Sequence, residues 1–317
     1  MKKISIVVPC YNEEKSVHKM HQIITDLFAT ELKNYDYELI FVDDLSPDNT
    51  RAEIEKICAQ DKKTKAVFNA KNFGYTRNVF QSLLYGDGDA TFMFFGDMQD
   101  PPQLLPQFVE KWEQGKKVII GQKINSSESK ILFFLRTMYY KVVKRFSSVK
   151  QVSHFNGYGL YDREFIDVLR QIDDSQPYLK GIVGEFAMKQ EIIQYEQSIG
   201  MREKSNVNFG RAYDAAMIGI TSYTKTFMRM ATFVGAGLGV LSGLFAMYIF
   251  LSKLLNWNTY PYGTASIIIG VFFIGAVQLF FTGILGEYIL SINTRTMRRP
   301  LVVVEKKINF DEDAALK

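Results

Sequence analysis

The chain has 317 residues, a formal net charge of +4 and a mean hydropathy of -0.06. So small a charge on a chain of this length does not by itself argue for nucleic acid as a partner, and none is expected. The two cysteines, Cys10 and Cys58, are too few for a disulfide framework and fit a reducing compartment. The near-zero mean hides an asymmetry, because charged residues lie mainly before Arg229 and the longest apolar runs follow it.

Before Arg229, short apolar runs alternate with amphipathic segments. The apolar runs predict strands at residues 4–12, 37–44, 65–70, 90–97 and 117–123. The segments between them predict helices at residues 13–32, 48–61, 75–86 and 102–115. Near-continuous apolar strands separated by helices predict an α/β fold with a mostly parallel sheet covered on both faces.

Polar clusters follow four of these strands, at the edge where parallel sheets bind ligands: CYNEE, VDDLSPD, NAKNFG and GDMQD. In the last cluster, Asp97, Gln99 and Asp100 offer the hard oxygen ligands that Mg²⁺ or Mn²⁺ prefers. So few ligands would leave room for substrate phosphates. The alternative is a strand-to-helix turn capped by Asp100. Asp43 and Asp44 are harder to explain as scaffold, since adjacent carboxylates repel.

Several enzyme classes are excluded by missing motifs. The chain has no GxxxxGK[ST] loop, no GxGxxG after a strand and no GxSxG turn. The three histidines lack the spacing of zinc ligands. What remains is a metal-assisted transfer of a group carried by a nucleotide.

The C-terminal third predicts a membrane anchor. Residues 230–252 and 265–285 carry no charge, and each is long enough to cross a hydrocarbon core of ~30 Å. A pair of buried core helices is the alternative. Lys and Arg flank the outer ends, whereas the connecting loop is uncharged and holds Trp257 and Tyr260. This pattern places both termini and the N-terminal domain in the cytoplasm.

Residues 129–148 predict an amphipathic helix, with Lys and Arg on one side and apolar residues on the other. Such a helix fits the headgroup region of a membrane, and a core-facing helix with a basic outer side is the alternative. A metal site, a basic interfacial helix and an anchor together indicate a lipid acceptor with an anionic head.

The motifs VVPCYNE, VDDLSPD, KNFG, DMQDPP, GLYDREFID and GITSYTK occur in this order before the anchor. In these features the chain resembles inverting GT-A glycosyltransferases of family 2, over about residues 3–300. The closest resemblance is to polyprenyl-phosphate sugar synthases of the dolichol-phosphate mannose synthase and bactoprenol glucosyltransferase type. It implies a GT-A domain at 1–210, a juxtamembrane segment at 211–229, a two-helix anchor at 230–290 and a cytoplasmic tail at 291–317.

The resemblance also implies roles for single residues. Those expected to contact the nucleotide sugar are Pro9, Tyr11, Glu13, Asp43, Asp44, Asn72, Gly74, Asp97 and Lys123. Asp97 and Gln99 are the expected metal ligands. Those expected to contact the phosphates of donor or lipid are Arg136, Arg202 and Lys204. The candidate catalytic residues are Asp97, Arg136 and Asp162, although Asp162 also fits a cap on the following helix.

Three positions depart from the family's pattern. Phe95 and Gly157 stand where relatives carry acidic residues, and Asn206 stands where a lysine is expected. The two lost carboxylates need not abolish activity. A phosphate acceptor has a second pKa of ~6 and is therefore largely ionised at neutral pH without a base.

The resemblance implies transfer of one sugar to polyprenyl (undecaprenyl) phosphate at the cytoplasmic face of a bacterial plasma membrane. UDP-glucose is the first expectation for the donor, followed by UDP-GlcNAc and GDP-mannose. A separate flippase and a downstream membrane glycosyltransferase are expected, because the sugar would be used on polysaccharide outside the cell. The family also implies a homo-oligomer, often a tetramer.

Two other functions stay open. A processive polysaccharide synthase is one, although the chain lacks the QxxRW motif of that class. A catalytically degenerate membrane scaffold is the other, and Phe95 and Gly157 are its motivation.

Overall fold

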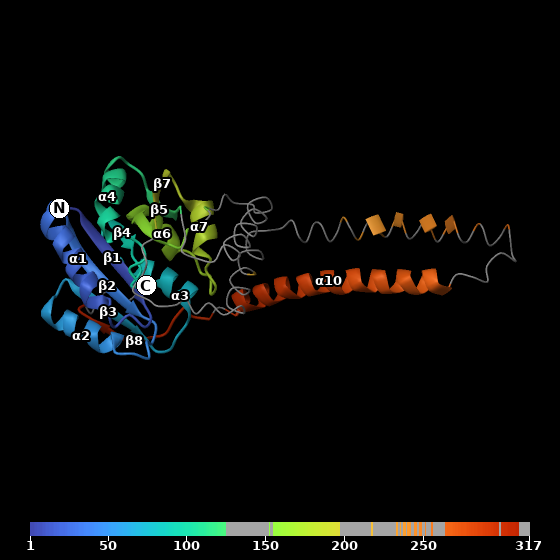
Figure 1. Cartoon of the computed structure of the whole chain (residues 1–317), viewed down its shortest axis with the longest axis horizontal. Coiled ribbons are helices and arrows are strands. Elements are labelled where there is room, and N and C mark those ends of the chain that lie inside the picture. The colour runs from blue at the N-terminus through green and yellow to red at the C-terminus, as the bar shows by residue number, and fades with distance from the viewer. Residues whose placement is uncertain are drawn as a thin grey trace.

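The computed structural model describes residues 1–124, 152, 155–196, 264–297 and 299–310, with scattered positions between 217 and 255. An eight-stranded mixed sheet organises the N-terminal part, in the order β7-β5-β6-β4-β1-β2-β3-β8 (Figure 1). The strands β1 to β4 run parallel where they are neighbours, and β5 pairs in parallel with β7. The predicted α/β class with a mostly parallel sheet is therefore confirmed.

The elements from the N-terminus to residue 123 follow the apolar pattern closely. The strands are β1 (Lys3–Cys10), β2 (Asp36–Asp43), β3 (Thr64–Asn69), β4 (Ala90–Met93) and β5 (Val118–Lys123). The helices are α1 (Val17–Thr30), α2 (Thr50–Gln60), α3 (Tyr75–Leu84) and α4 (Leu105–Glu113), with the 3-10 helix η1 (Pro102–Leu104) before α4. Several boundaries differ by up to four residues: β4 ends at Met93 rather than Asp97, and α1 begins at Val17 rather than Glu13.

Three strands were missed by the sequence analysis. β6 (Gly159–Asp162) lies antiparallel between β4 and β5, and β7 (Gln190–Tyr195) forms one edge of the sheet. β8 (Val304–Ile308) forms the other edge, antiparallel to β3. The helices α6 (Arg163–Arg170) and α7 (Leu179–Phe186) lie between β6 and β7. The tail predicted from residue 291 thus contributes a strand to the main sheet.

The core is built from both faces of the central strands. Ile4, Ile6, Val7 and Val8 of β1 are all fully buried, as expected for a strand with helices on both sides. An aromatic cluster fills the region around β4 and β6. Phe92 and Phe108 meet Tyr158 edge to face, with ring centroids 5.3 and 5.2 Å away. Edge-to-face pairs of this kind add stability beyond the apolar area they bury.

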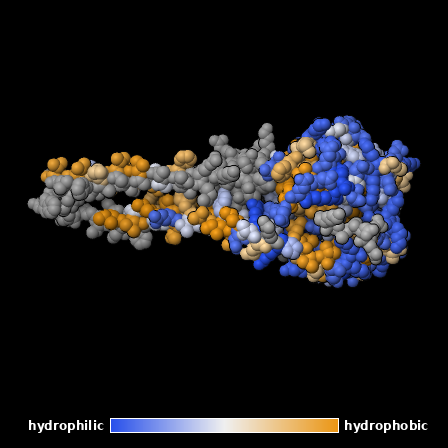
Figure 2. All heavy atoms as spheres, turned by 180° about the vertical axis from the view of Figure 1, so that it is seen from behind, coloured by the Kyte–Doolittle hydropathy of each residue, from blue (hydrophilic) through white to orange (hydrophobic). Residues whose placement is uncertain are grey.

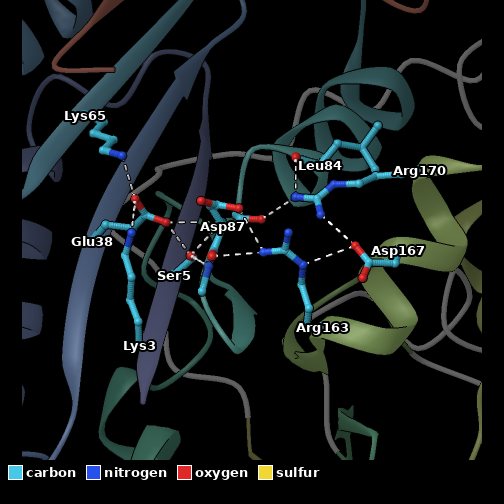
Figure 3. Close-up of polar contacts among 11 residues, drawn as sticks. Lys3, Ser5, Glu38, Lys65, Leu84, Asp87, Arg163, Asp167 and Arg170 are labelled. Carbon is cyan, nitrogen blue, oxygen red and sulfur yellow. Dashed lines mark hydrogen bonds and ion pairs between the residues drawn. The ribbon is translucent and has the colours of Figure 1, made fainter. Parts of the chain in front are cut away.

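A network of ion pairs and hydrogen bonds lies at the amino edge of the sheet, where the parallel strands begin (Figure 3). Glu38 is 2% exposed and pairs with Lys3 at 2.9 Å and Lys65 at 2.7 Å. Next to it, Arg163 pairs with Asp87 at 2.9 Å. The network continues to Arg170 of α6 through Asp167. We call these residues, with Ser5, the amino-edge network.

The long helix α10 (Thr264–Thr296) extends away from the domain (Figure 1). Among the described residues, the segment Phe273–Thr296 has the length and composition to cross a membrane, with a mean hydropathy of 1.6 and no buried part. Figure 2 shows apolar residues along this extension, in contrast to the mostly hydrophilic domain. The first predicted span, 230–252, lies outside the described residues except for scattered helical positions, and the predicted amphipathic helix 129–148 lies entirely outside them.

The C-terminal end of α10 is attached to the domain. The Ser175 hydroxyl donates to the Thr294 carbonyl at 3.1 Å, and Arg295 lies 3.3 Å from Asp174. The chain then enters β8 and pairs with β3. The helix is therefore tied to the sheet edge on the β3 side and to the loop between α6 and α7.

Candidate active site

Positive φ angles recur at the carboxyl edge of the sheet, while two further non-glycine examples, Lys189 and Asn309, lie at the amino edge. Asn12, Leu45 and Met98 have φ angles of 60°, 55° and 53°, and they follow β1, β2 and β4. Gly74, after β3, has a φ of 91°. Residues other than glycine seldom adopt these angles, and such strain gathers where a site must hold a fixed shape. Three of these turns therefore lie at the edge that carries the polar clusters.

Hydrogen bonds join the loop after β1 to the loop after β2. The Asn12 backbone N–H donates to the Ser46 hydroxyl at 3.0 Å, and the Glu13 N–H donates to the Thr50 hydroxyl at 2.7 Å. Ser46 in turn donates to Asp43 through both its N–H and its hydroxyl. Burial raises the pKa of Asp43, and these hydrogen bonds only partly offset it. Asp43 thus holds the turn that carries Ser46 against the first loop.

Asp44 accepts hydrogen bonds from a different loop than Asp43. One oxygen accepts from the Asn69 side chain at 2.9 Å and the Phe73 N–H at 3.1 Å, and the other accepts from the Gly74 N–H at 2.8 Å. Asp44 therefore shapes the loop between β3 and α3. Repulsion made these adjacent carboxylates hard to explain as scaffold. In the structure they point to different loops, and each accepts hydrogen bonds from its own set of donors.

Asp97 lies in a tight turn after β4. The Gln99 N–H donates to its carboxylate at 3.1 Å, and the Met98 N–H donates to the Phe95 carbonyl at 3.2 Å. A Cβ at Gly96 would lie 2.9 Å from the Glu13 side chain, so glycine allows the first loop to approach this turn. Glu13 is therefore brought next to the segment that carries the predicted metal ligands.

Asp100 is buried at 1% exposure and points away from solvent. It accepts from the Tyr195 hydroxyl and from the Asn156 side chain, the latter at 2.8 Å, and Lys123 lies 3.4 Å away. Burial and the charge of Asp100 raise the pKa of Tyr195. Asp100 is not the cap of the following helix, since Pro101 occupies that position. It fastens the Asp97 turn to the ends of β5 and β7.

Among the other predicted site residues, Pro9 is the penultimate residue of β1 and lies beside Val42, and Tyr11 is half-buried in the loop that follows. Asn72 is exposed in the loop after β3. Arg136, Arg202 and Lys204 lie outside the described residues. The predicted nucleotide-sugar residues thus share the carboxyl edge, and the phosphate-binding residues are not placed.

Asp162 lies elsewhere. It opposes Ala90 at the start of β4, which is the amino end of the parallel strands. Its carboxylate accepts from the Glu164 N–H at 3.0 Å and from the Trp112 indole at 2.7 Å, and Lys117 pairs with it at 3.1 Å. Asp162 therefore caps α6, the alternative role the sequence allowed, and the structure does not bring it together with Asp97.

The two departures from the family's acidic pattern are neighbours in space. A Cβ at Gly157 would lie 3.4 Å from the Phe95 ring, and the φ of Gly157 is 118°. A side chain at this position would strain the backbone. Tyr75 lies on Phe95 with ring centroids 5.8 Å apart and an interplanar angle of 19°. An apolar surface therefore occupies the place of two carboxylates.

The oxygen donors of this edge fit a weakly held divalent ion rather than a protein cage. Among the described residues no group of three or more His, Cys, Asp or Glu side chains could hold a metal. Mg²⁺ typically takes one or two carboxylates and completes its shell with water and substrate phosphates. Asp97 with Gln99, half-buried at a strand end, matches that donor set.

The sequence analysis missed Tyr75, Asn156 and Tyr195 as parts of this edge. Tyr75 directly follows the KNFG motif, so its place at a strand end was a usable signal. Asn156 and Tyr195 carried none, because their link to Asp100 spans 56 and 95 residues of chain.

Residues 5–185 match the family described as glycosyl transferase family 2. The SfII prophage-derived bactoprenol glucosyl transferase of Shigella flexneri is 27% identical over 305 residues, covering 96% of this chain and 98% of that protein. A putative glycosyltransferase of Bacillus subtilis, CsbB, is 28% identical over 305 residues and covers 96% and 91%. The crystal structure of mannosyl-3-phosphoglycerate synthase from Rubrobacter xylanophilus superposes with a TM-score of 0.49 at 16% identity, covering 70% and 73%. Because the family match spans more than half of the chain, the protein belongs to glycosyl transferase family 2 and is a glycosyltransferase.

Proposed function

We propose that the protein transfers one glucose from UDP-glucose to polyprenyl phosphate, with inversion at the anomeric carbon. Relatives named bactoprenol glucosyl transferase cover nearly the whole chain, which supports this acceptor and this sugar. The observation that carries the proposal is the carboxyl edge, where Glu13 and the Asp97 turn are held together by strained, interlocked loops.

The donor would lie along this edge. Asp97 and Gln99 would hold a divalent cation, Mg²⁺ or Mn²⁺, which when bound neutralises the charge of the leaving diphosphate. The loops fastened by Asp43 and Asp44 would shape the nucleotide pocket. Asp100 would keep the Asp97 turn in register with β5 and β7. These contacts position the reactants, which is a large part of a transfer between two bound partners.

The acceptor supplies its own nucleophile. An oxygen of the phosphate forms the new bond to the anomeric carbon, while the bond from that carbon to the donor diphosphate breaks and UDP leaves. The phosphate has a second pKa of ~6 and needs no proton removed at neutral pH. This fits the apolar contact between Phe95 and Gly157, where a catalytic base would otherwise be expected.

We place this reaction at a membrane. The candidate span Phe273–Thr296 has no buried part, and its end is tied to the domain through Thr294 and Arg295. A two-span anchor with both termini in the cytoplasm, a homo-oligomer and a separate flippase with a downstream transferase belong to the same proposal.

The decisive assay combines the purified full chain, undecaprenyl phosphate, a divalent cation and one donor at a time. UDP-glucose, UDP-GlcNAc and GDP-mannose are compared by mass spectrometry of the lipid product. A lipid carrying one glucose supports the proposal, and a single different sugar reassigns the donor. A polymer would indicate a processive synthase, and no consumption of any donor would indicate a scaffold.

The topology has its own test. A cysteine at Asn258, in the predicted outer loop, should react with an impermeant maleimide in intact cells. A cysteine at Lys306, an exposed position in β8, should react only after lysis. Cys10 and Cys58 are buried and give little background. Labelling of Lys306→Cys in intact cells would overturn the cytoplasmic placement of the domain.

A further inference from the structure

Tyr75 is a large aromatic residue that remains 60% exposed beside the proposed donor site. It is the first residue of α3, directly after Gly74, whose N–H is held by Asp44. Phe95, which packs under it, lies two positions before Asp97. Figure 1 shows α3 on the side of the domain from which α10 extends. The ring therefore belongs to the carboxyl edge, close to the turn that carries the proposed metal ligands.

The ring is fixed in orientation rather than loosely exposed. One face lies on Phe95, nearly parallel to it at 19°. The Tyr75 hydroxyl donates to the Asn156 carbonyl at 2.7 Å, and the Asn156 side chain donates to Asp100 at 2.8 Å. The chain of contacts joins the ring to the same buried group that holds the Asp97 turn. A fixed aromatic face loses little conformational entropy when a ligand covers it.

The support of the ring is apolar. Phe95 is 7% exposed, and behind it a Cβ at Gly157 would meet Phe95, Leu179 and Val79, each at 3.4 Å. A diphosphate or a metal ion gains nothing from such a surface. A ligand group with an apolar face does, since aromatic side chains in binding sites supply apolar contact area while a few polar groups fix the orientation.

We propose that Tyr75, seated on Phe95, is a specificity-determining residue that packs against the apolar C–H face of the hexopyranose carried by the donor. The inference rests on the proposed function and deepens it, because it names the part of the donor that this chain recognises with an aromatic ring. The uracil base is the other flat group of the donor, and the experiment separates the two.

The test measures binding of UDP and of UDP-glucose to the full chain by calorimetry with Mn²⁺ and without acceptor. Tyr75→Ala should weaken UDP-glucose about fivefold to tenfold and leave UDP unchanged. Tyr75→Phe keeps the ring and removes the hydroxyl that bonds to Asn156, so it should bind UDP-glucose nearly as wild type. Tyr35→Ala removes an aromatic ring near Trp112 at the amino edge and serves as the matched control.

Each outcome has one meaning. Equal weakening of UDP and UDP-glucose in Tyr75→Ala would assign the ring to the base and overturn the proposal. Unchanged binding of both ligands by a folded Tyr75→Ala would also overturn it. Loss in Tyr75→Phe equal to that in Tyr75→Ala would show that the hydroxyl acts, not the ring. Wild-type protein that binds neither ligand would instead refute the proposed function, so the two failures are distinguishable.

Discussion

The amino edge and the carboxyl edge of the sheet, where the parallel strands begin and end, use charge in opposite ways. At the amino edge, buried Glu38 lies between Lys3 and Lys65, and Arg163 bridges two carboxylates. At the carboxyl edge, Asp43, Asp44 and Asp100 are buried but accept mostly neutral hydrogen bonds from loops. Strained residues accompany them, and Asp97 is left half-buried. The amino edge pairs its buried carboxylate with lysines, whereas the carboxyl edge uses its buried carboxylates to hold loops in a fixed shape.

The largest expected effect is on catalysis from a change at the carboxyl edge. Asp97→Asn keeps the size of the side chain and removes its charge, so transfer should fall by about 10²–10³-fold while the melting temperature stays nearly constant. Initial rates with saturating donor and Mn²⁺ measure transfer, and calorimetry measures the melting temperature. Asp162→Asn is the matched control at the amino edge, where stability should fall more than the rate. Equal activity in excess EDTA and in Mn²⁺ would refute the metal role of Asp97.

The second effect should appear in stability alone. Glu38→Gln leaves two lysines without their partner and should cost about 2–3 kcal/mol, less than a fully buried pair because water reaches Lys3. Activity per folded molecule should not change. Glu113→Gln, which breaks an exposed pair with Lys2, should cost about 0.5 kcal/mol or less. A rate defect in folded Glu38→Gln would show that the edges are coupled.

The same carboxylate predicts a pH dependence. Burial alone would raise the pKa of Glu38, but hydrogen bonds from Lys65, Ser5 and Lys3 outweigh it and lower the pKa from 4.5 to about 2. The folded-state pKa lies below the unfolded value, so this contribution is present above about pH 4.5 and is lost as the pH falls toward 2. Denaturant melts of wild type should therefore lose stability over this range more steeply than those of Glu38→Gln.

A smaller effect tests whether Asp100 positions the Asp97 turn. Asp100→Asn keeps the shape but weakens the contact with Lys123, so kcat should fall about tenfold with little change in KM for the donor. Tyr195→Phe removes one donor from the same group and should move kcat in the same direction by less. A change confined to KM would instead indicate that Asp100 or Lys123 meets the donor directly.

The sequence predicted the fold where local pattern decides it. β1 to β5 and the helices between them follow from apolar runs, because a strand covered on both faces needs no information from its neighbours. β7 and β8 were missed for the opposite reason. Both are edge strands rich in polar residues, and their pairing with β5 and β3 brings together segments far apart in the chain.

The candidate site, like the fold, was predictable from the sequence only in part. The polar clusters at strand ends were predicted to lie together at the carboxyl edge, and they do, since topology alone brings those ends together. The separate tasks of Asp43, Asp44 and Asp100 were not predictable, because each depends on donors from other loops. The capping role of Asp162 was available from sequence as an alternative, since its partner Glu164 is a near neighbour.

The smallest effect concerns two strained residues, Leu45 at the carboxyl edge and Lys189 at the amino edge. Leu45 has a φ of 55°, which costs a branched side chain about 1–2 kcal/mol, whereas glycine avoids that cost and loses about 0.5–1 kcal/mol of entropy. Leu45→Gly should therefore raise the free energy of unfolding by about 0.5 kcal/mol. Lys189→Gly, with a φ of 46° in the turn before β7, should gain a similar amount.

The two variants should differ in function. Leu45 lies between Asp44 and Ser46, so a glycine there loosens the turn that joins the first two loops, and UDP-glucose binding should weaken a few-fold, on the order of threefold. Lys189→Gly changes a turn at the amino end of β7 and should leave binding unchanged. Denaturant titrations and calorimetry on the same preparations measure both quantities. If both glycines stabilise the fold and neither affects binding, the strain at Leu45 serves no purpose in the site, and the contrast between the edges rests on charge alone.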